Sequence, residues 1–291
     1  MATNVETIDH QHYHPPGLQH QFEDMGQQME SASIGMWVFL AQEIMFFGGM
    51  FTVYLVFRSK YPMAFAAGSN HLNEWLGMAN TLILIVSSLT MALAVHYAQL
   101  GKRNLQVGLI ILTMLFGASF LGIKAYEYAE KYRDGLVPVA GWNLKTSGEE
   151  AVAENALKDA NGEENYVNPR GNFQWKDNSL AVRAQQEGIL TTSEKNGYLE
   201  NGEVNQVSFQ GKVQIFFWIY FAMTGLHALH MIIGLGIMTW LLWKAWRYSF
   251  TPEYYAPVEM AGLYWHFVDI VWIFLFPLLY LLGRHFGGGH G

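Results

Sequence analysis

The stretch that decides the fold is Tyr264-Trp-His-Phe-Val-Asp-Ile-Val-Trp-Ile-Phe-Leu-Phe-Pro-Leu-Leu-Tyr-Leu-Leu-Gly283. Its length matches the ~20 apolar residues that an α-helix needs to cross the hydrocarbon core of a bilayer. His266 and Asp269 lie three residues apart, so they share one face of that helix. A charged side chain at the bilayer centre costs about 2.5–3.5 kcal/mol on insertion scales. Asp269 therefore needs a partner, a wet cavity or a proton.

Four more apolar runs of similar length precede this one. The five expected spans cover approximately residues 33–57, 75–100, 105–128, 213–243 and 257–283. Because lipid offers the backbone no hydrogen bonds, such runs cross a membrane only as helices. The sequence therefore predicts an all-α fold, a polytopic membrane bundle of five transmembrane helices. Pro257 suits a first helical turn, and Pro277 predicts a kink in the fifth helix.

A polar, acidic stretch separates the third and fourth spans, and we expect it to form an extramembrane insertion. It is interpreted either as a small cap packed on the bundle or as a partly disordered segment. Trp142 and Trp175 favour partial order, and Asn161, Asn196 and Asn201, each followed by glycine, predict turns. The expected organisation is a polar, His-rich N-terminal tail (1–32), helices 1–3 (33–133), the insertion (134–210), helices 4–5 (211–286) and a C-terminal tail (287–291).

Composition narrows the class of protein. Of 291 residues, 51% are hydrophobic and only 14% are charged, against about 25% charged in typical soluble domains. The chain has no cysteine, which excludes disulfides, thiolate metal sites and cysteine nucleophiles. A formal charge of −7 argues against nucleic acid as a partner. Residues 1–32 lack both the basic and the apolar region of a signal peptide, so the first span is expected to direct its own insertion.

Several ionisable side chains fall inside the expected spans, where such groups are functional candidates by default. Glu43 lies near the middle of the first span, and a packing role is as plausible for it as a functional one. His227 and His230 lie one turn apart in the fourth span, where hydrogen bonding to a neighbouring helix is favoured over metal or haem ligation. Lys124 and Glu127 are interpreted as a structural ion pair rather than a proton relay.

Together these segments resemble subunit III of the haem–copper respiratory oxidases, the cytochrome c oxidase family. The matching strings occur in the family order and are Gln42-Glu-Ile-Met-Phe-Phe47, Asn80-Thr-Leu-Ile-Leu84, Ala125-Tyr-Glu-Tyr128, Thr224-Gly-Leu-His-Ala-Leu-His-Met-Ile-Ile-Gly234 and Tyr264-Trp-His-Phe-Val-Asp-Ile-Val-Trp-Ile-Phe-Leu275. The last two strings are specific. The resemblance covers the five spans, about three quarters of the chain, and is to the five-helix form of the family.

The resemblance implies an accessory, non-catalytic subunit of a proton-translocating cytochrome c oxidase complex, with catalytic subunit I and subunit II as partners. Haem and copper would lie in those partners, with no redox cofactor and no metal in this chain. Phospholipid would be held in a cleft between helix groups, and the subunit would stabilise the core, support proton uptake and aid oxygen access. The residues that match family positions near the bundle interior or near lipid phosphate are Glu43, His227, His230, Lys244, Arg247, Glu259, His266 and Asp269.

Topology and partners beyond the core stay open. The resemblance implies a cytoplasmic N-terminus in a bacterial inner membrane, whereas the counted loop charges weakly favour an external one. A cytochrome c donor or a larger respiratory supercomplex are further possible partners. A quinol oxidase or a nitric oxide reductase would use an equivalent subunit. Hypotheses of another class are a membrane b-type cytochrome, using pairs among His96, His227, His230 and His266, and a small-solute transporter, although no internal repeat is visible.

Overall fold

The computed structural model describes residues 18–138, 173–247, 250, 254–281 and 283. Within these residues, five helices are long and apolar enough to cross a membrane. The predicted all-α bundle of five membrane helices is confirmed. The five are α1 (Met25–Lys60), α3 (Glu74–Gln99), α4 (Arg103–Arg133), α8 (Gln206–Trp246) and α9 (Ala256–Phe276).

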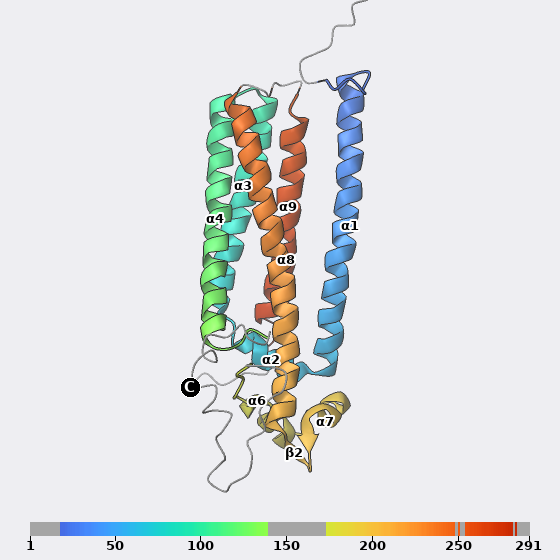
Figure 1. The fold of residues 1–291 in the computed structure, drawn as a ribbon, viewed down its shortest axis with the longest axis vertical. Coiled ribbons are helices and arrows are strands. Elements are labelled where there is room, and N and C mark those ends of the chain that lie inside the picture. Colours follow the sequence, from blue (N-terminus) through green and yellow to red (C-terminus); the bar gives the residue numbers. More distant parts are fainter. Residues whose placement is uncertain (1–17, 139–172, 248–249, 251–253, 282, 284–291) are drawn as a thin grey trace, which may run out of the picture.

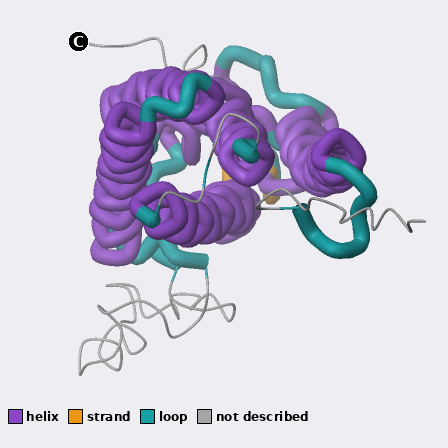
Figure 2. The backbone as a smooth tube through the Cα atoms, turned by 90° about the horizontal axis from the view of Figure 1, so that it is seen from above, coloured by secondary structure: helices purple, strands orange, loops and turns teal. Residues whose placement is uncertain are grey.

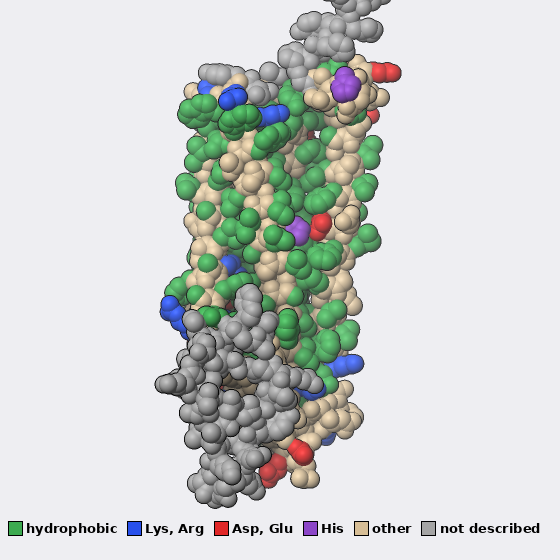
Figure 3. All heavy atoms as spheres, in the orientation of Figure 1, with side chains coloured by type: hydrophobic (Ala, Val, Ile, Leu, Met, Phe, Trp, Pro, Cys, Tyr) green, Lys and Arg blue, Asp and Glu red, His purple; other side chains and the backbone are tan. Residues whose placement is uncertain are grey.

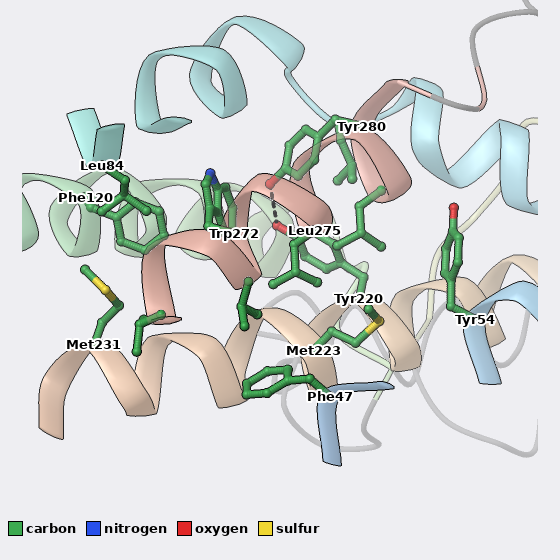
Figure 4. Packing of buried hydrophobic residues seen from close by; sticks show 14 of the residues in the cluster. Phe47, Tyr54, Leu84, Phe120, Tyr220, Met223, Met231, Trp272, Leu275 and Tyr280 are labelled. Atoms are coloured by element: carbon green, nitrogen blue, oxygen red, sulfur yellow. Dashed lines mark hydrogen bonds between the residues drawn. The ribbon is translucent and has the colours of Figure 1, made fainter. Parts of the chain in front are cut away.

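Four of these helices form one bundle. α3 packs on α4 and α9, and α8 packs on α4 and α9 (Figure 1). Trp265 of α9 lies fully buried between the other helices, because Gly117 of α4 and Gly234 of α8 leave room for its ring. A Cβ atom at either glycine would lie within 3 Å of the indole. Lower in the core, Phe120 and Trp272 meet edge to face at 4.8 Å between ring centroids (Figure 4).

The helix α1 lies to one side of this bundle (Figures 1 and 2). Only three of its 36 residues are buried, namely Leu40, Phe47 and Tyr54. Their seven-residue spacing makes one narrow stripe along the helix, the pattern of a single contact seam. None of residues 25–39 is buried. Phe39, next to Leu40, also packs on Tyr264 of α9 with 5.9 Å between ring centroids. α1 is therefore held at its middle and at its end, whereas residues 25–35 have no buried side chain.

A short helix, α2 (Pro62–Asn70), follows α1 at the far end, and seven of its nine residues are buried. It meets a π-helical turn, η2 (Pro277–Leu281), that continues α9 at the position where a kink was predicted. Proline has no N–H to donate, so the α-helical ladder is interrupted there. The carbonyl of Leu278 accepts a hydrogen bond from Tyr54 of α1, and the carbonyl of Leu279 accepts one from Ser69 of α2.

The described part of the expected insertion packs against α2 and the start of α8 as a small cap (Figure 1). It contains α6 (Ser179–Gln186), α7 (Thr192–Tyr198) and a hairpin of β1 (Leu199–Glu200) and β2 (Glu203–Val204). The predicted turn at Asn201 is confirmed, since Asn201 and Gly202 both have positive φ and join the two strands. The turn predicted at Asn196 is wrong, because Asn196 lies inside α7, and Asn161 lies outside the described residues. Trp142 lies outside the described residues, whereas Trp175 is buried beside Phe217.

Two helix boundaries differ from those expected. α1 begins at Met25, within the stretch expected to be a tail, because the Asp24 side chain accepts from the N–H of Gln27 and caps the helix. α8 begins at Gln206, where Asn205 provides a similar cap. With 41 residues, α8 is about 60 Å long. Since the hydrocarbon core is only about 30 Å thick, the first turns of α8 extend beyond it and lie beside the extramembrane cap.

Candidate functional site

One acidic and one basic candidate, Glu43 and His230, meet between α1 and α8. The distance from Glu43 Oε2 to His230 Nε2 is 3.2 Å, and the two side chains are 12% and 14% exposed. Phe47 of α1 packs on the imidazole with 5.3 Å between ring centroids. Figure 3 shows a histidine beside an acidic side chain about midway along an otherwise apolar face. The pair thus joins the outlying helix to the bundle at mid-membrane depth.

The hydrogen bonds of His230 orient its imidazole ring. Nδ1 lies 2.8 Å from the carbonyl oxygen of Leu226, which can only accept, so Nδ1 donates this hydrogen bond. The other ring nitrogen, Nε2, is thereby directed at Glu43.

His227, one turn earlier on α8, points to a different neighbour. Its Nε2 donates to the carbonyl of Val268 on α9 at 3.1 Å. The ring is 1% exposed and lies 5.3 Å from both Phe120 and Trp272, measured between ring centroids. The two histidines therefore do not converge on a common ligand. His227 cross-links α8 to α9, as the hydrogen-bonding interpretation predicts.

His266 and Asp269 both lie on α9 but do not bind each other. His266 Nδ1 forms a 2.7 Å hydrogen bond with the hydroxyl of Ser88 on α3. Asp269 is 2% exposed, and neither of its carboxyl oxygens has a hydrogen-bond partner among the described residues. Removing a carboxylate from water without a partner is costly, so Asp269 is best accommodated as the neutral acid.

The remaining candidates, Lys244, Arg247 and Glu259, lie where α8 ends and α9 begins. Lys244 Nζ lies 4.5 Å from the Trp240 ring centroid, and the guanidinium of Arg247 lies 4.1 Å from that of Trp243. These basic residues end α8, where positive charge complements the helix dipole. Glu259 lies in the first turn of α9, and its Oε2 atom is buried without a partner among the described residues.

A second buried polar cluster surrounds Lys124, and we call it the lysine cage. It comprises Lys124 and Glu127 of α4, Tyr220 of α8, and Trp272 and Tyr280 of α9 and η2. Lys124 Nζ donates to Glu127 Oε2 at 2.7 Å, to Tyr280 Oη at 2.8 Å and to Tyr220 Oη at 3.3 Å. The ammonium also lies 4.9 Å from the Trp272 ring centroid.

The two tyrosines of the lysine cage also bind the carboxylate of Glu127. Tyr220 and Tyr280 both donate to Glu127 Oε1, at 3.0 Å and 2.6 Å. Figure 4 shows the two phenols pointing toward each other from α8 and η2. All three ammonium hydrogens and both carboxylate oxygens are therefore satisfied, which a buried ion pair requires if it is to offset its desolvation. The predicted ion pair between Lys124 and Glu127 is present.

Outside the membrane-spanning helices, His71 joins α2 to the cap. Burial and the nearby Lys131 ammonium lower the pKa of His71 below its ordinary value of 6.5. Asp134, 3.5 Å away, opposes that shift but does not reverse it. The ring also lies 5.4 Å from Trp175, measured between centroids. The imidazole is accordingly neutral near pH 7 and acts as a packing residue.

Among the described residues, no group of three or more histidines and carboxylates is placed to hold a metal ion. Sequence reasoning missed Tyr220, Tyr280 and Ser88, which bind the predicted polar residues. The available signal was a tyrosine or serine hydroxyl within an apolar span, since such hydroxyls seek partners. A single sequence does not predict which helices pack against each other.

Comparison with known proteins finds relatives in the family that the sequence resembles. The family model described as "Cytochrome c oxidase subunit III" matches residues 191–284. "Cytochrome c oxidase subunit 3" of Thermostichus vulcanus is 25% identical over 95% of this chain and 93% of its own length. The protein of that name from Corynebacterium diphtheriae is 27% identical over 86% and 87%. "Quinol oxidase subunit 3" of Bacillus subtilis is 25% identical over 86% of both chains.

Proposed function

This chain belongs to the subunit III family of the haem–copper oxidases, and we propose that it acts there as an accessory scaffold without a redox centre of its own. As an integral membrane subunit of an oxidoreductase complex, it assembles with other oxidase subunits. Its proposed partners are the catalytic subunit I and subunit II, which would carry the haem and copper. We place it in a bacterial inner membrane with a cytoplasmic N-terminus.

The observation that carries the scaffold role is how the buried histidines are used. His227 binds the Val268 carbonyl on α9, His266 binds Ser88 on α3, and His230 faces Glu43 on α1. Each of the three therefore links two helices. A haem ligand needs a ring nitrogen directed at a shared cofactor site, and this arrangement favours helix joining over a b-type cytochrome.

The second element of the proposal is phospholipid binding beside α1. Large apolar side chains on α1 and α8 stay exposed, including Ile34, Trp37 and Val38 on α1 and Ile232 on α8. Lys244 and Arg247 lie at the end of α8, each over a tryptophan ring. Exposed apolar helix surface with basic and tryptophan residues at its border suits acyl chains and a phosphate headgroup. Lipid held there would keep the flank of the catalytic subunit dry and open to oxygen.

The test compares the purified oxidase with and without this subunit. We expect similar initial oxygen reduction by both preparations, slower proton uptake without the subunit, and a progressive loss of activity during turnover. Equal persistence of activity in both preparations would count against the scaffold role. An absorption spectrum of the isolated chain provides a separate check, because bound haem absorbs visible light.

The electron donor of the complex is a second question, since relatives carry both names. Cytochrome c oxidase subunits and quinol oxidase subunits match this chain at 22–27% identity. We propose cytochrome c as the donor and a quinol as the alternative. Oxygen consumption by the purified complex with reduced cytochrome c or with a quinol separates the two.

A further inference from the structure

The extramembrane cap makes its closest polar contacts at the corner where α1 ends and α2 begins. Residues 60–62 form this corner, with Lys60 ending α1 and Pro62 starting α2. Helix ends leave backbone groups without intrahelical partners, namely N–H groups at the start and carbonyls at the end. Both kinds of group occur at this corner, and side chains of the cap bind one of each.

Glu194 of α7 binds the start of α2. Its Oε1 accepts a 2.7 Å hydrogen bond from the N–H of Met63, and the carboxylate is fully buried. Its Oε2 accepts from the N–H of Thr191 at 3.0 Å, which completes the capping box of α7 itself. One carboxylate thus caps two helices that lie far apart in the sequence.

Thr191 binds the end of α1. Its hydroxyl lies 3.2 Å from the Lys60 carbonyl and 3.1 Å from Glu194 Oε2, so it has two acceptors within reach. Two contacts support the same corner from the side. Gly197 lies against Tyr61, where a Cβ atom would approach the ring to 2.7 Å, and Lys212 of α8 lies 4.8 Å from the centroid of that ring.

The rest of the cap is fixed to the bundle, so it provides a rigid base for these contacts. Ala181 and Ala184 of α6 are buried, and α6 packs against α2. Tyr198 of α7 meets Phe209 of α8 edge to face at 5.2 Å. Burial and the nearby Glu194 carboxylate raise the pKa of Tyr198, so its phenol stays protonated.

From this geometry we infer that the cap segment Phe173–Asn205 is a clamp that sets the angle of α1 relative to the bundle. Above the corner, α1 touches the bundle only along one narrow stripe, where Phe39 packs on Tyr264 and Glu43 faces His230. A helix axis needs two fixed points to have a defined direction, and the cap contacts at the corner supply the second one. The 36 residues of α1 span about 54 Å. A rotation of about 10° at the corner would move the opposite end by about 9 Å. Changes of this size at the α1 flank would alter the space for any molecule that binds there.

The absence of cysteine from the chain makes a distance measurement direct. Spin labels at Ser31→Cys on α1 and Leu105→Cys on α4 report the separation of the free end from the bundle, because both positions are exposed. The labelled full chain is measured in lipid nanodiscs by pulsed electron–electron double resonance. The variants are Glu194→Ala, Glu194→Gln and, as a matched control, Glu203→Ala at an exposed position of the hairpin.

We expect one narrow distance distribution in the parent chain and in Glu203→Ala, and a distribution shifted or broadened by several ångströms in Glu194→Ala. Glu194→Gln keeps a carbonyl acceptor for Met63 and should restore most of the narrow distribution. An unchanged distribution in folded Glu194→Ala overturns the clamp. If Glu194→Ala does not fold, Thr191→Ser and Thr191→Val replace it. Serine should keep the distribution and valine should broaden it, and equal distributions overturn the clamp.

This inference concerns the position of α1 and does not rest on the proposal of phospholipid binding. A shifted α1 with no change in bound phospholipid would support the clamp and count against the lipid part of the proposed function.

Discussion

Replacing Lys124 by methionine should destabilise the bundle more than any other single change at a lysine in the described residues. Lys124 is 3% exposed and Glu127 is fully buried. Without the ammonium, Glu127 Oε2 loses its 2.7 Å partner and keeps a negative charge inside the bundle. Removing one partner of a buried, hydrogen-bonded ion pair costs about 3–5 kcal/mol. We expect a loss of that size in the free energy of unfolding.

The double variant Lys124→Met/Glu127→Leu separates charge from packing. It removes both charges and leaves the phenols of Tyr220 and Tyr280, which lie 3.4 Å apart and can hydrogen-bond to each other. At most one hydroxyl hydrogen is then without an acceptor, which costs about 1–3 kcal/mol, so the double variant should be more stable than Lys124→Met alone. Equilibrium unfolding of the full chain in detergent, followed by circular dichroism, measures all three proteins. Lys195→Met, at an exposed position of α7, is the control and should match the parent.

The reasoning about the lysine cage is refuted if Lys124→Met is as stable as the parent, or if the double variant is less stable than the single one. The first result would mean that the ion pair contributes nothing to joining α4, α8 and η2. The second would mean that Glu127 stabilises the bundle without its lysine partner, so that it is not an uncompensated buried charge.

Three further predictions concern other polar residues. Glu43→Gln should leave the proton-pumping stoichiometry of the assembled complex unchanged, because Glu43 is proposed to join α1 to α8; abolished pumping with intact assembly and lipid would refute this. Asp269→Leu should raise the free energy of unfolding by about 1–3 kcal/mol, because it removes a buried carboxyl without a partner; a loss of turnover in a stably folded complex would instead assign Asp269 a functional role. The pKa of His71 is lower in the folded state than its ordinary 6.5, so the unfolded chain binds more protons below that value and stability should fall as the pH drops below about 6.5. His71→Gln should weaken this pH dependence in unfolding experiments, and an identical dependence would contradict the assignment.

How far the fold follows from the sequence depends on the element. The five membrane helices are predictable because each apolar run is long enough to cross a bilayer and interrupted by few charges. The ion pair of Lys124 with Glu127 is predictable because the two residues lie three apart on one helix. The pairing of Glu43 with His230 is not, since 187 positions separate them and only the packing of α1 on α8 brings them together.

Local capping explains the other differences. The sequence marks the first 32 residues as polar, yet α1 starts at Met25 because Asp24 caps it and because an exposed helix end needs no apolar residues. From the sequence, Pro277 predicts a kink, and the structure has a π-helical turn there. In this turn two consecutive carbonyls, those of Leu278 and Leu279, accept hydrogen bonds from two different helices. In the sequence, Glu194 is one acidic residue of a polar insertion. Its hydrogen bond with the N–H of Met63 depends on α2 lying beside α7, which the sequence does not predict.

The most direct test of the scaffold role is a count of bound phospholipid. Native mass spectrometry of the purified oxidase would compare the complex containing this chain with the complex carrying Glu43→Ala, which removes the polar contact between α1 and α8 at mid-membrane depth. We predict tightly bound phospholipid in the parent complex and fewer phospholipid molecules in the variant, with all subunits retained. A parent complex that keeps no phospholipid after delipidating washes, or a variant that keeps the same number, would contradict the proposal.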